Sequence, residues 1–89
     1  SMRGPGTPGV VEVFNMKNYI LSKFKELGIN AVSVRVKKMT HYSVFSVFIK
    51  DNVKDEALFK VKAIFKTQFD FIRRGNFKHD CKAIIDVVV

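Results

Sequence analysis

Cysteine and long apolar runs are both scarce in this chain. Of its 89 residues only Cys81 is a cysteine, which excludes an internal disulfide and a thiolate-rich metal site. No apolar run approaches the roughly twenty residues that a membrane-spanning helix needs. The start of the chain also lacks a signal-peptide core. We therefore expect a cytoplasmic protein in a reducing compartment, with no membrane partner.

The residue patterns of common catalytic sites are missing as well. The chain contains no Gly-x-Ser-x-Gly, no P-loop and no Gly-x-Gly-x-x-Gly. His41 and His79 fall in predicted turns, and His79 with Asp80 and Cys81 does not have the spacing of a zinc site. Cys81 opens an apolar run, which favours a buried, unreactive thiol. The sequence predicts no enzyme, no metal and no cofactor.

Acidic residues are half as frequent as basic ones. Sixteen Lys and Arg against eight Asp and Glu give a net charge of +8 and an isoelectric point near 9.9. Such a balance favours polyanionic partners, chiefly nucleic acid, which is bound by phosphate neutralisation and counterion release. A solvated basic face without a partner is the alternative.

Glycine and proline are concentrated at the start of the chain. Residues 1–9 hold both prolines and three of the five glycines. We expect these residues to be a disordered tail or a cloning remnant, and residues 10–89 to form a single domain. The hydrophobic content of 47% is ample for one core.

Residues 42–50 are expected to form the central strand of the domain. They are rich in β-branched and aromatic side chains, and alternation puts Phe45, Val47 and Ile49 on the core face. The opposite face carries Tyr42, Val44, Ser46 and Phe48.

Residues 31–38 alternate in the same way and are predicted to pair with this strand through a turn at 39–41. Their core side consists of valines: Val32, Val34 and Val36. Arg35 and Lys37 then lie on the open face beside Tyr42 and Phe48. Cations interleaved with aromatic rings are the main functional signal in the sequence.

Two helices and a closing strand complete the prediction. A first helix from Asn15 to about Leu27 has an apolar stripe and ends at Gly28. A second begins near residues 51–52, continues to Ile72 with a break near 67–68, and is followed by a last strand over residues 81–89. The fold class is α+β, with both helices on one face of a small, mainly antiparallel sheet. If residues 10–14 form a strand the order is β-α-β-β-α-β, as in ferredoxin-like domains; otherwise it is α-β-β-α-β.

The longer of these orders resembles the RNA-recognition-motif domains, which stack bases on aromatics of two sheet strands. Residues 11–16, Val-Glu-Val-Phe-Asn-Met, resemble the first-strand motif of that family, with Glu12 in place of the stacking aromatic. Residues 42–48 resemble its third-strand motif in position and aromatic content. The resemblance implies RNA or DNA binding on the open sheet face.

A second resemblance is to small domains associated with large polyvalent proteins of phages and plasmids. It covers residues 15–80 and depends on Ser-Val-Arg at 33–35, Tyr-Ser at 42–43, Ile-Lys-Asp at 49–51, and the Phe69, Gly-Asn-Phe and Asp80 positions that follow. It implies a role on a mobile element, acting on nucleic acid or on host defence.

The sequence thus predicts a small, basic, non-enzymatic nucleic-acid-binding domain. The predicted contact residues are cations and rings of the open face and of the exit of the second helix: Arg35, Lys37, Tyr42, Phe48, Arg73, Arg74 and Lys78. The alternative is a protein-interaction module, in which the apolar part of the same face, with Tyr42, Val44 and Phe48, docks a partner or a second copy of the chain.

Overall fold

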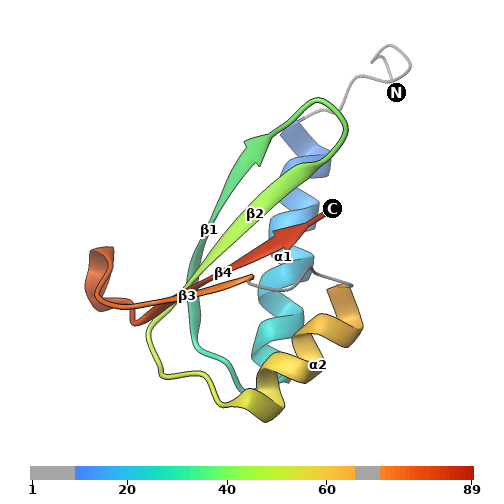
Figure 1. The fold of residues 1–89 in the computed structure, drawn as a ribbon. Helices are drawn as coiled ribbons and strands as arrows, with labels where there is room; N and C mark the ends of the chain where they lie inside the picture. Colours follow the sequence, from blue (N-terminus) through green and yellow to red (C-terminus); the bar gives the residue numbers. More distant parts are fainter. Residues whose placement is uncertain (1–9, 66–70) are drawn as a thin grey trace.

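The computed structural model describes residues 10–65 and 71–89 as two helices and a four-stranded antiparallel sheet (Figure 1). The strand order is β1-β2-β4-β3, so β1 and β3 form the two edges. The elements in chain order are α1 (Val10–Glu26), β1 (Ala31–Lys38), β2 (Ser43–Ile49), α2 (Asp55–Phe65), β3 (Ile72–Arg74), the 3₁₀ turn η1 (Lys78–Asp80) and β4 (Ala83–Val88). The predicted α+β class is confirmed.

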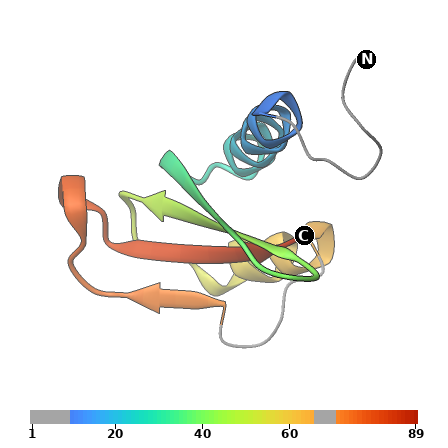
Figure 2. The same cartoon turned by 90° about the horizontal axis from the view of Figure 1, so that it is seen from above.

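Both helices pack on the same face of the sheet, as predicted. The core joins Ile20 and Phe24 of α1 and Val61 of α2 to alternate residues of β2 and β4. The sheet side of this core consists of Phe45, Val47, Ile49, Ala83, Ile85 and Val87. Figures 1 and 2 show the helices together on one side, with the β3–β4 connection extending away from them. The other sheet face carries no helix of the described chain.

Helix α1 begins earlier than the sequence predicted. Residues 10–14 are helical, which excludes the alternative with a strand there, and the predicted cap Asn15 lies inside the helix. Val13 packs against the core one turn before Met16, on the stripe that continues to the fully buried Ile20. Burial of this face outweighs the strand propensity of the valines. The described order is therefore α-β-β-α-β-β, which is not the ferredoxin-like order.

Helix α2 is shorter than predicted and is followed by a strand. It spans 11 residues, and the predicted break at 67–68 falls outside the described residues. Ile72, expected at the end of the helix, opens β3 opposite Ile85 and packs on the core. The N–H of Asp86 also donates to the Phe71 carbonyl at 2.8 Å. Pairing with β4 satisfies backbone groups that a lone extended segment would leave to water.

The pairing of β1 with β2 confirms the predicted faces, with one exception. Val34 lies opposite Val47 and Val36 opposite Phe45, on the core side, while Arg35 lies opposite Ser46 on the open side. The register shifts between residues 31 and 33, and Val32 is 40% exposed. An irregularity of this kind changes which way a side chain points, so the assignment of Val32 to the core face was wrong.

The β3–β4 connection is a tight hairpin tip. The N–H of Gly75 donates to the Lys82 carbonyl, and that of Phe77 donates to the Cys81 carbonyl at 2.8 Å. His79 and Asp80 at its apex have φ near +58° and +59°, the mirror-image turn that suits the twist of paired strands. The turn fixes the backbone on either side of Lys78 and His79. Cys81, just after it, is buried as predicted.

No helix in the described part of the chain is long and apolar enough to cross a membrane.

Candidate nucleic-acid interface

The open sheet face is built by all four described strands. Residues that face one another across the strands form three rows on this face. The first row is Lys37, Val44 and Val88, and the middle row is Arg35, Ser46 and Asp86. The third row is Ser33, Phe48 and Ile84, with Arg73 of β3 beside Ile84. Among these, Ile84 is buried and the others are half-buried or exposed. The face is therefore mixed, with polar groups in its middle row.

Arg35 and Phe48 form the contact that the sequence predicted between a cation and a ring on this face. The guanidinium carbon of Arg35 lies 5.8 Å from the centroid of the Phe48 ring. Arg35 is exposed and Phe48 is half-buried. A guanidinium held over a ring presents a flat cationic surface on which a base can stack.

A hollow of about 380 Å³ surrounds the middle of β1 next to this pair. Besides residues 33–36 and Phe48, it is lined by Lys17, Lys78 and His79. Lys17 comes from α1, Arg35 from β1, and Lys78 with His79 from the hairpin tip, so three separate segments bring cations to it. None of the described residues that line it is acidic.

Lys78 therefore joins Arg35, as predicted, whereas Lys17 and His79 were missed as members of this site. No local pattern marks Lys17, because its place depends on how α1 packs beside β1. His79 was expected on the surface, and it is exposed; the tight turn directs it to the hollow. His41 is also exposed, in the β1–β2 turn.

Arg73 lies on the open face but has an acidic partner. One of its guanidinium nitrogens lies 3.0 Å from Asp86 Oδ1, and the Ser46 hydroxyl donates to the same oxygen at 2.6 Å. Asp86 thus supplies negative charge in the middle of the face that was predicted to be cationic. The sequence did not predict this pairing.

Arg74 lies on the opposite side of the sheet, because neighbouring residues of a strand point to opposite faces. Its guanidinium donates to the Val53 carbonyl at 3.2 Å and lies 3.8 Å from Asp55 Oδ1. The prediction that Arg73, Arg74 and Lys78 form one cationic cluster is therefore wrong for Arg74. The cause is the misassignment of residues 72–74 to a helix.

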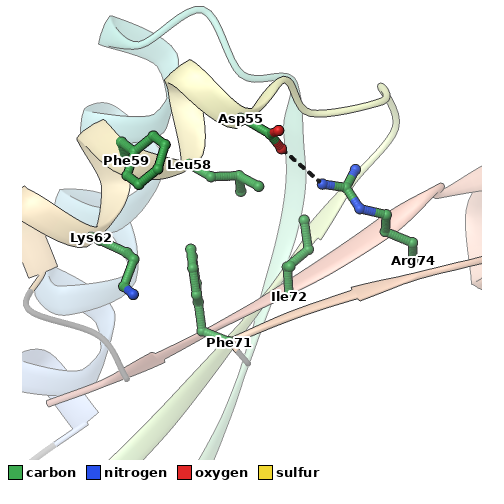
Figure 3. Close-up of a pocket in the computed structure, with 7 residues that line it drawn as sticks. All are labelled: Asp55, Leu58, Phe59, Lys62, Phe71, Ile72 and Arg74. Carbon is green, nitrogen blue, oxygen red and sulfur yellow. Dashed lines mark ion pairs between the residues drawn. The ribbon is translucent and has the colours of Figure 1, made fainter. Parts of the chain in front are cut away.

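Arg74 instead borders a second hollow, of about 350 Å³, between α2 and β3. Figure 3 shows the Phe71 ring rising between Lys62 and Leu58, with the ion pair of Asp55 and Arg74 at one end. The Lys62 ammonium lies 5.9 Å from the centroid of that ring. This hollow is mainly apolar, and its arginine is already engaged, so we do not include it in the nucleic-acid interface.

Tyr42 does not share the site with Phe48. It precedes β2, whereas Phe48 is near the end of that strand, and six residues of strand span about 20 Å. Tyr42 is 46% exposed, and Met39, whose N–H donates to the Tyr42 carbonyl, is also exposed. The open face therefore has an apolar end at Tyr42 and, away from it, a cationic end, defined as the Arg35–Phe48 pair with the hollow beside it.

Comparison with known proteins gives no information on this site, so only its geometry can be used to interpret it. No protein-family model, no curated protein and no solved structure matches this chain. The two family resemblances described above therefore remain predictions. Within the described residues, no group of three or more His, Cys, Asp and Glu could hold a metal ion.

Proposed function

We propose that this chain is a non-enzymatic nucleic-acid-binding domain that uses the cationic end of its open sheet face. The observation that carries this proposal is the hollow beside the Arg35–Phe48 pair, which gathers cations from α1, β1 and the hairpin tip and has no acidic group among its described lining residues. The net charge of +8 favours the same class of partner at long range.

The arrangement suggests a division of labour. Lys17, Lys78 and Lys37 would neutralise phosphates, which gives affinity without reading sequence. Arg35 would contact a phosphate and, together with Phe48, supply stacking area for a base; such stacking contributes about 1–3 kcal/mol per base. Arg73 would contribute little while Asp86 neutralises it. Arg74 and Tyr42 lie elsewhere, so we do not include them among the proposed contact residues.

Salt dependence tests this proposal. If Lys17, Arg35, Lys37 and Lys78 each contact one phosphate, the log–log slope of affinity against salt for a single strand should be about −2 to −3. Raising the salt from about 50 to 200 mM should then weaken binding about 15- to 50-fold. Fluorescence anisotropy with a labelled 20-nucleotide single strand measures this slope. Absence of binding at low salt would refute the proposal.

Removing the negative charge of Asp86 should strengthen binding. In Asp86→Asn the amide oxygen can still accept from Ser46, while Arg73 is released from its ion pair. We expect affinity for the same oligonucleotide to rise about three- to tenfold and the salt slope to steepen by about 0.7. Loss of this exposed pair should cost less than about 1 kcal/mol of stability.

The matched control for this variant is Asp51→Asn. Asp51 is exposed on the loop before α2, next to a different hollow, and the change removes the same charge. It should alter affinity by less than about twofold. Equal gains in the two variants would mean that net charge alone controls binding and would contradict a role for this face.

The apolar end of the open face supports a second candidate function, docking of a protein partner or a second copy of the chain. Tyr42 and Met39 are 46% and 42% exposed there, and Val44 and Val88 beside them are half-buried. An apolar interface of this kind should hold or tighten as salt rises, since excluded salts strengthen apolar burial. The salt titration therefore separates the two candidates.

A further inference from the structure

The free edge of β1 is the longest unpaired strand edge in the described sheet. The strand is eight residues long and pairs only with β2, while the other edge, β3, has three residues. An unpaired edge presents N–H and C=O groups that can pair with another extended chain.

The hydrogen-bond register identifies which groups face outward. The Met39 N–H donates to the Tyr42 carbonyl, so the facing pairs 37–44, 35–46 and 33–48 are the ones that bond to β2. On the far side of β2, Ser43 exchanges two hydrogen bonds with Val89, which fixes the same alternation independently. The backbone groups of Val34, Val36 and Lys38 therefore point away from the sheet.

This outward edge is open and lies between cations. The hollow around β1 is lined by Val34 and Val36, so neither α1 nor the hairpin tip fills the space beside them. Lys17 lines the hollow from the helix side, and Arg35 and Lys78 line it from the open-face side. In an added strand, side chains would alternate between these two sides. Acidic side chains would therefore lie near a cation on the helix side or on the open-face side.

We propose that the β1 edge binds an extended acidic segment of a partner protein as a fifth strand of the sheet. Backbone hydrogen bonds to Val34 and Val36 would hold the segment, and Lys17, Arg35 and Lys78 would select negative charge. A second copy of β1 fits this edge poorly, because Arg35, Lys37 and Lys38 of the two copies would be brought close together. The inference goes beyond the proposed nucleic-acid binding and does not depend on it.

Val36→Pro tests the backbone part of this proposal. Proline removes the Val36 N–H, one of three that face outward, and prolines are tolerated on edge strands at such positions. Val36→Ala is the matched control, because it shortens the same side chain but keeps the N–H. The probe is a ten-residue peptide of alternating threonine and glutamate, titrated by isothermal calorimetry. We expect Val36→Pro to bind about tenfold more weakly than Val36→Ala, the effect of about one lost hydrogen bond.

Amide hydrogen exchange on the unaltered protein provides a second readout that does not depend on the folding of the proline variant. The amides of Val34, Val36 and Lys38 should exchange rapidly in the free protein and become protected when the peptide is added. Oligonucleotide binding should be the same in Val36→Pro and Val36→Ala, which separates this inference from the proposed function.

Several outcomes would overturn the inference. They are no binding of the peptide, equal binding by the two variants, and no added protection of these three amides. Protection by an oligonucleotide and not by the peptide would assign the edge to nucleic acid. Protection in the free protein that rises with its concentration would assign the edge to a second copy.

Discussion

Phe45→Ala will lower the free energy of unfolding by about 3–5 kcal/mol, the usual cost of emptying a phenylalanine site in a core. Phe45 is 4% exposed, lies opposite Val36 and Val87 in the sheet, and belongs to the core that both helices cover. For a domain of this size the loss corresponds to a fall in melting temperature of more than about 12 °C. Thermal and denaturant unfolding followed by circular dichroism measure it.

Phe48→Ala is the control on the same strand. Phe48 lies three residues further on the open face and is only half-buried, so its removal should cost about 1 kcal/mol. Equal losses in the two variants, or a larger loss in Phe48→Ala, would contradict the assignment of the helix-covered and open faces.

The alternation of apolar residues was enough to predict the centre of the sheet. Phe45, Val47 and Ile49 on one face of β2, and Arg35 on the open side of β1, follow from a period of two residues, which a strand imposes on any sequence. The stripe of Met16, Ile20, Phe24 and Leu27 predicted the buried face of α1 in the same way, and all four contribute to the core. These predictions needed no knowledge of distant contacts.

The ends of the elements could not be predicted in this way. Residues 10–14 have strand propensity but form a helix, and residues 72–74 continue a helical spacing but form β3. In both places the outcome depends on a partner far along the chain, the core for Val13 and β4 for Ile72. Local propensity is weak compared with such burial.

The same limit explains which of the predicted contact residues were placed on the correct face of the sheet. Arg35 and Lys37 followed from alternation within one strand. Arg73 and Arg74 were placed together because a helix exit was expected, whereas a strand sends them to opposite faces. Asp86 could have been found, since alternation in the last strand puts it on the same face as Ile84; its pairing with Arg73 required knowledge of β3.

Reversing two charges at the hollow should abolish most nucleic-acid binding. In Arg35→Glu with Lys78→Glu, two phosphate contacts are lost and two anions stand in their place. At about 50 mM salt each phosphate contact contributes nearly one order of magnitude to the affinity for a single strand. We therefore expect the affinity to fall by at least about 100-fold. Both side chains are exposed, and the melting temperature should change by only a few degrees.

The most direct test of the site is to compare this variant with Lys54→Glu, Lys60→Glu. That control makes the same change in net charge at two exposed lysines, one just before α2 and one within it, outside the hollow. Anisotropy titrations of one labelled single strand at about 50 mM salt should show a loss of affinity of about 100-fold for Arg35→Glu, Lys78→Glu. The control variant should lose less than about fivefold in affinity. Equal losses in the two double variants would contradict binding at the cationic end of the open face.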